Sequence, residues 1–281
     1  MKQIKIKCPA KINLTLEVVN KRPDGFHNIK SIMQMISLYD YLIIKIKHAG
    51  ENKISLSGNS DEIPYNEKNL VYKACELFLK EAGIDGVDIE INIEKNIPIS
   101  AGLAGGSTNG AGTIFGLNEI FKTFNKSELN NLCAQLGSDL NVCLNGGCTL
   151  ATSRGEVTEP LPVIEKEVTL IKPINLGISA KEAYTKYSLK TEKPQNNMTE
   201  KMLEAINNNQ DIEPFLYNDL EYAVFGDYSE LQVIKKAHPN AVMSGSGSTY
   251  FVLENLKETK LNTDYLIINN LEFINDGVSI A

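Results

Sequence analysis

A glycine-rich stretch at residues 98–108 has the composition of a phosphate-binding loop. It consists, in order, of Pro98, Ile99, Ser100, Ala101, Gly102, Leu103, Ala104, Gly105, Gly106, Ser107 and Thr108. It follows an expected strand and opens an expected helix. Glycines and a helix N-terminus together direct backbone N–H groups and partial positive charge toward an anion. The spacing is neither GxxxxGK[ST] nor GxGxxG, which excludes the ordinary P-loop and the dinucleotide fingerprint. The alternative is a flexible loop that only makes a close contact between helix and sheet.

A second glycine-rich stretch lies between two expected strands near the C-terminus. It is formed by Ser244, Gly245, Ser246 and Gly247. A second phosphate contact is one interpretation, and a plain hairpin turn is the alternative.

Three polar residues supply the other groups that phosphoryl transfer requires. Lys11 and Asn13 point to the same side of an expected strand, and Asp139 follows an expected helix. Phosphoryl transfer needs a nucleotide cradle, positive charge at the reacting phosphate and often a carboxylate that accepts the hydroxyl proton. The chain has a candidate for each. Taken singly, Lys11 could be a solvated strand residue and Asp139 an ordinary turn or cap carboxylate.

Composition and charge exclude other classes of protein. The 281 residues carry a net charge of −7, which argues against binding nucleic acid or an anionic membrane through bulk positive charge. Lys5 and Lys7 interrupt the first apolar residues, and no long apolar run follows, so neither a signal peptide nor a membrane span is expected. The five cysteines and three histidines are scattered, which indicates neither a disulfide framework nor a metal cluster. We expect a cytoplasmic protein.

The periodicity of apolar residues predicts mixed strands and helices in the first half. Alternation predicts strands at 4–18, 29–47 and 87–93, with a turn at 22–25 before the second. Helical spacing predicts a helix after Asn69 that ends at Gly83, another around residues 114–120 after a glycine-rich connection at 97–112, and a third at 127–137.

Near residue 160 prolines interrupt the chain, and short strands and helices replace the long strands. This change predicts a domain boundary at about residue 158. Beyond it the pattern predicts helices at 199–206 and 229–237. It also predicts short strands at 168–171, 241–243, 249–253, 265–268 and 271–274. The expected class is α+β, with domains at 1–158 and 159–281.

Four motifs in chain order resemble those of the GHMP kinases. They are Pro-Ala-Lys-Ile-Asn-Leu at 9–14 with Asp-Gly-Phe-His at 24–27, the loop at 98–108, Gly-Ser-Asp at 137–139, and Ser-Gly-Ser-Gly at 244–247. Within that family the first motif is most similar to the branch that acts on 4-diphosphocytidyl-2-C-methyl-D-erythritol. The motifs span most of the chain.

The resemblance implies a two-domain GHMP kinase fold, with an N-terminal ATP-binding domain like ribosomal protein S5 domain 2 and a ferredoxin-like C-terminal domain. It implies ATP and Mg²⁺ as cofactors and a small cytidine diphosphate alcohol as substrate, phosphorylated on its 2-hydroxyl in non-mevalonate isoprenoid synthesis. The alternatives are a GHMP kinase for another small alcohol and a non-catalytic nucleotide-binding relative.

The resemblance also implies residue roles. Asp139 is at the position of the proton-accepting aspartate and Lys11 at that of its partner lysine. Asn13 is at a substrate-hydroxyl position, and Phe26 and His27 are where the family stacks on and reads cytosine. Asn69 and Lys95 are expected on the adenine side of the ATP pocket. Ser107 and Thr108 could hold the metal, or they could cap the helix.

Four departures from the family pattern accompany these matches. Phe26 replaces a tyrosine and keeps only its ring, whereas Ala104 replaces a glycine and is tolerable only if its φ is negative. Asn141 and Cys143 replace a proline and an aromatic residue after Asp139. Ala180 replaces a threonine on the substrate side, with Ser179 as a possible substitute.

Overall fold

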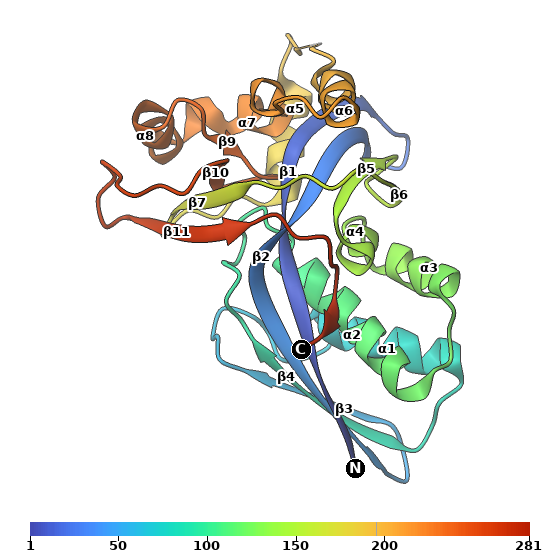
Figure 1. Cartoon of the computed structure of the whole chain (residues 1–281). Helices are drawn as coiled ribbons and strands as arrows, with labels where there is room; N and C mark the ends of the chain where they lie inside the picture. The colour runs from blue at the N-terminus through green and yellow to red at the C-terminus, as the bar shows by residue number, and fades with distance from the viewer. Residues whose placement is uncertain (195) are drawn as a thin grey trace.

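Two long strands form the spine of the molecule and carry the site. The computed structural model describes residues 1–194 and 196–281. Strand β1 covers Lys2–Lys21 and strand β2 covers His27–His48. They pair antiparallel, and the ribbon in Figure 1 shows them running from the lower part of the molecule to the upper one. The predicted turn at 22–25 joins them and contains a hydrogen bond from the Gly25 amide to the Arg22 carbonyl, at 3.1 Å.

The larger sheet has eight strands in the order β12-β1-β2-β4-β3, with β5 pairing β2 and β6, and β8 pairing β1. Its further strands are β3 (Lys53–Gly58), β4 (Val87–Glu94), β5 (Cys148–Thr152), β6 (Val157–Pro160), β8 (Tyr217–Asn218) and β12 (Ser279–Ile280). Strands β8 and β12 lie beyond the predicted domain boundary, so the C-terminal part of the chain completes the N-terminal sheet. The domain boundary at residue 158 stays a prediction.

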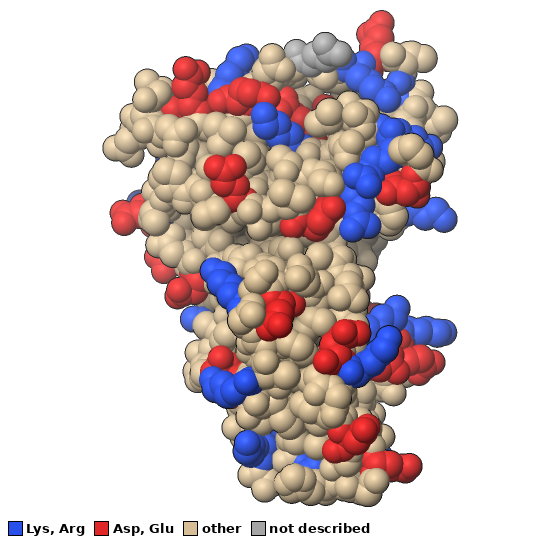
Figure 2. Space-filling view, turned by 90° about the vertical axis from the view of Figure 1, so that its right-hand side faces the viewer, with Lys and Arg blue, Asp and Glu red and all other residues tan. Residues whose placement is uncertain are grey.

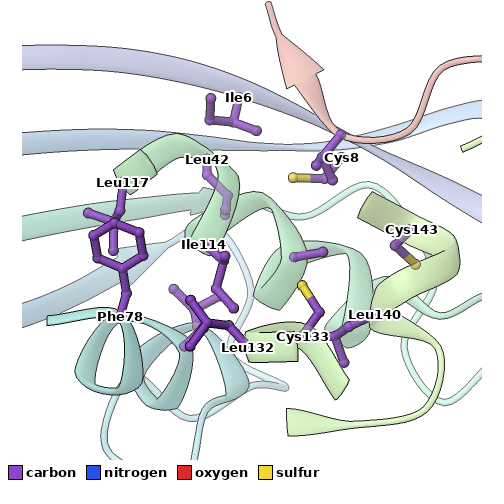
Figure 3. Packing of buried hydrophobic residues seen from close by; sticks show 14 of the residues in the cluster. Ile6, Cys8, Leu42, Phe78, Ile114, Leu117, Leu132, Cys133, Leu140 and Cys143 are labelled. Carbon is purple, nitrogen blue, oxygen red and sulfur yellow. The ribbon is translucent and has the colours of Figure 1, made fainter. Parts of the chain in front are cut away.

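Four helices cover one face of this sheet. They are α1 (Leu70–Ala82), α2 (Gly105–Phe121), α3 (Lys126–Leu136) and α4 (Leu140–Asn145). Figure 3 shows their apolar side chains, among them Phe78, Ile114, Leu132 and Leu140, gathered against Ile6 of β1. Burial of this apolar surface holds the helices on the sheet.

The second sheet has the order β11-β7-β10-β9 and belongs to the upper part of Figure 1. Its strands are β7 (Glu167–Pro173), β9 (Val242–Met243), β10 (Tyr250–Val252) and β11 (Tyr265–Glu272). Around it lie α5 (Ala180–Leu189), α6 (Met198–Asn207), α7 (Asp219–Val224) and α8 (Ser229–Ala237), with short 3-10 turns at Glu213–Phe215 and Phe225–Asp227.

Most predicted elements are present, and the helix after the glycine loop begins earlier than expected. Asn69 caps α1 by accepting from the Val71 amide, and Gly83 ends that helix in the left-handed conformation. The connection predicted at 97–112 is already helical from Gly105. Its glycines serve packing, because a Cβ at Gly112 would lie 2.4 Å from the Cys8 Sγ of β1. The alternative interpretation of the loop was that its glycines only allow a close contact between helix and sheet. That close contact is made by the helix after the loop.

Within the described residues no helix is long and apolar enough to span a bilayer. All five cysteines are buried free thiols.

Candidate functional site

A cavity of about 760 Å³ lies where β1, the β1–β2 turn, α5 and both glycine loops meet. Lys11, Asn13, Phe26, His27 and Asp139, separated by up to 128 positions in the chain, all line it. Gly102, Ala104, Gly245 and Ser246 of the two loops line it as well. The fold thus brings together the predicted catalytic and substrate residues.

Lys11 is fixed at the floor of this cavity by three oxygen atoms. Its Nζ donates to Asn13 Oδ1 at 2.6 Å and to the Gly102 carbonyl at 3.1 Å, and it lies 3.7 Å from Asp139 Oδ2. The lysine side chain is 4% exposed, so little water screens its charge from the cavity. Register shifts in the β1–β2 pairing after Pro9 and after Asn13 bracket this segment and re-aim its side chains.

Asp139 is the carboxylate that this lysine faces. It lies at the N-terminus of α4 but accepts no capping hydrogen bond there, and its side chain is 31% exposed. The cap interpretation offered for Asp139 is therefore wrong. An ionised carboxylate with unused lone pairs, held by a lysine at a cavity wall, can accept a proton from a bound hydroxyl group.

Asn13 is buried and its amide is engaged on both sides. Its Oδ1 accepts from Lys11, and its Nδ2 donates to Ser31 Oγ at 2.8 Å. One amide N–H is left for the cavity that it lines.

The two glycine loops lie against each other. A Cβ at Gly102, where φ is +75°, would lie 2.0 Å from the Ser244 carbonyl oxygen, and a Cβ at Gly245 would lie 2.9 Å from the Gly102 carbonyl oxygen. Ser244 Oγ also donates to the Gly102 carbonyl at 3.0 Å. Only glycine permits this approach, so the stretch at 244–247 is more than a plain hairpin turn.

A smaller cavity of about 270 Å³ lies on the other side of the first loop. It is lined by Ile63, Asn69, Lys95, Asn109 and every residue from Pro98 to Gly106. Gly102 and Ala104 line both cavities, which therefore meet at the loop. Ser107 and Thr108 line neither, although Thr108 carries a buried hydroxyl with no hydrogen-bond partner. Neither caps α2, whose N-cap is Ala104.

Lys95 lines the smaller cavity and forms an ion pair with Asp40, a residue that was not predicted to contribute to the site. Its Nζ pairs with Asp40, which is fully buried and also accepts from Asn109 Nδ2 at 3.0 Å. The other Asp40 oxygen accepts from the backbone amides of Asn96 and Ile97 at 2.7 and 2.8 Å. Asp40 thereby fixes the chain that enters the glycine loop. Nothing in its sequence context distinguishes it from a solvated strand residue.

Aromatic rings line the outer end of the larger cavity. His27 stacks on Tyr184 of α5 with centroids 5.0 Å apart and planes 15° apart, and its Nε2 lies 3.0 Å from Ser188 Oγ. Burial, aided by the nearby positive charges of Lys21 and Lys193, lowers the pKa of His27, which favours the neutral ring. Phe26 is 54% exposed, and the Arg154 guanidinium lies 5.2 Å from the centre of its ring.

Tyr184 and Arg154 line this end without having been expected there. Tyr184 belongs to a helix that the sequence analysis did not predict. Arg154 follows strand β5 and is separated from Asp139 by helix α4 and that strand, so no local motif joins the two residues.

The structure shows the surroundings of the residues that depart from the family pattern. Ala104 has φ +58°, so the negative φ that would make its methyl group tolerable is not adopted, and the residue is held in a strained conformation. Asn141 donates to the Glu156 carbonyl at 3.0 Å, and Cys143 is buried in the core. Ala180 lines the larger cavity, whereas Ser179 caps α5 by accepting from the Glu182 amide. Ser179 is therefore not a free substitute for a substrate-side threonine.

Comparison with known proteins decides the family. Residues 69–149 match the model of the GHMP kinases N terminal domain. The chain is 41% identical over 260 residues to the 4-diphosphocytidyl-2-C-methyl-D-erythritol kinase of Lachnoclostridium phytofermentans, which covers 89% of this chain and 87% of that relative. The chain belongs to the GHMP kinase family. The relative of the same name from Clostridium botulinum is 40% identical over 260 residues, which cover 88% of this chain and 89% of that relative.

Solved structures place this GHMP kinase in the expected fold. A crystal structure of 4-(cytidine 5'-diphospho)-2C-methyl-D-erythritol kinase matches with a TM-score of 0.73 and 30% identity, over 89% of this chain and 90% of that one. The homoserine kinase of Cytophaga hutchinsonii matches with a TM-score of 0.76 at 17% identity, over 100% and 98% of the two chains, and shares the fold alone. The α+β GHMP kinase fold expected from the sequence is confirmed.

Proposed function

We propose that this GHMP kinase transfers the γ-phosphoryl group of ATP to the 2-hydroxyl of 4-diphosphocytidyl-2-C-methyl-D-erythritol. The observation that carries the proposal is the pair of Lys11 and Asp139, 3.7 Å apart, in a cavity that shares Gly102 and Ala104 with a second cavity on the far side of the loop. A nucleotide in the smaller cavity and an alcohol in the larger one would meet at this loop. Its curated relatives carry the name of this kinase.

The larger cavity suits a substrate with a charged diphosphate. Among the side chains that line it, four are basic and only Asp139 is acidic, the basic ones being Lys11, Lys21, Arg154 and Lys181. This local excess of positive charge occurs in a protein whose net charge is −7. On the face shown in Figure 2, basic and acidic side chains are interspersed. The positive charge on the cavity wall favours the binding of an anionic small molecule there.

The rings at the outer end suit a nucleobase. Phe26 is exposed toward the cavity, and His27 lies parallel to Tyr184. A flat pyrimidine stacks on such rings and receives polar contacts from a neutral imidazole, which carries one donor and one acceptor. Mevalonate and homoserine have neither a base nor a diphosphate and would leave this end unfilled.

In the proposed reaction the Asp139 carboxylate accepts the proton of the 2-hydroxyl as its oxygen attacks the γ-phosphorus. The Lys11 ammonium holds that carboxylate and faces the negative charge that develops on the transferred group. Backbone N–H groups of the first loop, at the start of α2, face the remaining phosphates. ADP is the leaving group.

We propose that Mg²⁺ accompanies ATP and neutralises its phosphate charge. Within residues 1–194 and 196–281 no group of three or more His, Cys, Asp or Glu residues could hold a metal ion. This fits an ion bound mainly by phosphates and water with one or two protein oxygens. Ser107 and Thr108, in the first turn of α2, line neither cavity, and Thr108 is fully buried, so neither hydroxyl is assigned as a ligand of the ion.

A coupled ADP-release assay tests the proposal. The protein is mixed with ATP, Mg²⁺ and, separately, 4-diphosphocytidyl-2-C-methyl-D-erythritol, mevalonate or homoserine. We expect turnover with the cytidyl alcohol alone. Turnover with another alcohol would keep the kinase chemistry and overturn the substrate, whereas ATP binding without turnover would favour a non-catalytic nucleotide-binding protein.

A further inference from the structure

Asn218 lies in the interior between strand β1 and the second glycine loop. It belongs to none of the motifs described above. It ends strand β8, which pairs in parallel with β1 so that Asn218 is opposite Leu16. The residue is 3% exposed. It is therefore attached to the strand that carries Lys11 and Asn13.

The Asn218 amide group is fully used by two different elements. Its Oδ1 accepts from the amides of Leu220 and Glu221 at 2.8 and 3.4 Å, which caps helix α7. Its Nδ2 donates to the carbonyls of Met243 and Gly245 at 2.6 and 2.8 Å. Two donors and two acceptor sites are all that an asparagine side chain offers. The acceptor half serves the helix, and the donor half serves the loop.

The loop that Asn218 holds is in contact with the reacting groups. A Cβ on Gly245 would lie 3.2 Å from Lys11 Nζ, and both Gly245 and Ser246 line the cavity that contains Asp139. Gly245 has φ +55°, which glycine adopts freely and other residues rarely do. The same backbone packs on Gly102, whose carbonyl oxygen accepts from Lys11.

We infer that Asn218 is a positioning residue for phosphoryl transfer, acting through its hydrogen bonds to the loop at 243–245. This inference rests on the proposed function. Loss of the donor half lets Gly245 move relative to Lys11 and Gly102, where the reacting phosphoryl group would lie. The smaller cavity and the aromatic end of the larger one are lined by other residues, so binding of both substrates is preserved.

Two variants remove the Nδ2 amide donors and leave an acceptor for the helix cap. Asn218→Ser leaves a short hydroxyl, which is a good N-cap. Asn218→Asp keeps the size and shape of the side chain but turns a carboxylate oxygen toward two carbonyl oxygens. It is the more severe variant, because these oxygens repel each other. Asn125→Ser is the matched control, because Asn125 also caps a helix, α3, and lies on the surface outside both cavities.

The test combines steady-state kinetics with ATP, Mg²⁺ and the cytidyl alcohol with amide hydrogen exchange of the peptide 243–248. For Asn218→Ser we expect kcat to fall about 10- to 100-fold, the size of effect that a misplacement of about 1 Å produces. Both KM values should stay within about threefold and exchange should rise in 243–248 but not in α1. Asn125→Ser should match the unchanged protein in every readout.

Three results would overturn the inference. They are an unchanged kcat in both Asn218 variants, faster exchange in 243–248 without any loss of kcat, and a parallel change of kcat, both KM values and exchange throughout the chain. The last of these would assign Asn218 to global stability. Absence of turnover in the unchanged protein would refute the proposed function instead, while local exchange in the variants would still report the contact with the loop.

Discussion

Replacement of Lys95 by methionine tests whether the ion pair beneath the glycine loop holds that loop in place. Asp40 is fully buried, and the Lys95 side chain is 7% exposed. Lys95→Met removes the positive charge and keeps most of the apolar stem. The Asp40 carboxylate is then left in the interior without its cation, which is far more costly than the loss of a surface pair.

The expected loss of unfolding free energy follows from the contacts of Asp40. Breaking a buried ion pair costs about 3 to 5 kcal/mol. Asp40 would keep the amides of Asn96 and Ile97 and the Asn109 amide as donors, so we expect the lower value, about 3 kcal/mol. For a chain of this size that corresponds to a fall in Tm of about 6 to 12 °C.

Thermal unfolding followed by circular dichroism measures this change. The double variant with Asp40→Asn should recover more than half of the lost Tm, because no uncompensated charge remains buried. Lys47→Met is the control, since Lys47 is half-exposed where it pairs with Asp88 and Glu90, and its Tm should change by less than about 3 °C. A Tm for Lys95→Met equal to that of the Lys47 control would show that the buried ion pair does not hold the loop in place.

Three further substitutions test the site. Asp139→Asn should lower kcat about 10²- to 10⁴-fold while calorimetry finds ATP affinity largely intact, and near-normal turnover would remove Asp139 from its assigned role. Phe26→Ala should raise KM for the cytidyl alcohol about tenfold without a comparable change for ATP, because a stacking ring is lost; an unchanged KM would make Phe26 a structural residue. Gly102→Ala should lower the unfolding free energy in urea by at least about 2 kcal/mol, because its Cβ would lie 2.0 Å from the Ser244 carbonyl oxygen. Gly106→Ala, where a Cβ meets nothing within 4 Å, should lose less than half as much, and equal losses would contradict the close packing of the loops.

The elements that are visible in the sequence are those with strong periodicity or capping. Alternation along β1, β2 and β4 and the Asn69 cap of α1 predicted the strands and helix that are observed. Helix α5 was not predicted, because its two fully buried residues, Ala183 and Tyr187, do not form a clear apolar stripe. Tyr184 was missed with it.

The candidate site was predictable where a residue sits in a distinctive motif, and it was not where its role depends on distant partners. Lys11 and Asp139 belong to recognisable motifs, and the fold brings them within 3.7 Å. Asp40 and Asn218 act through hydrogen bonds to residues 55 to 69 and 25 to 27 positions away, which no local pattern records. Ala104 has φ +58°, and the residue type does not indicate a positive φ there, because alanine usually avoids it.

Proton-coupled ³¹P NMR of the reaction product shows which hydroxyl of the cytidyl alcohol receives the phosphate. The carbon that bears the 2-hydroxyl also bears the methyl branch and therefore has no hydrogen. We expect a new phosphomonoester signal that is not split by a carbinol proton, because the phosphate goes to the 2-hydroxyl. A signal split by carbinol protons, from a phosphate on another hydroxyl, or the absence of any new phosphomonoester, would contradict the proposed function.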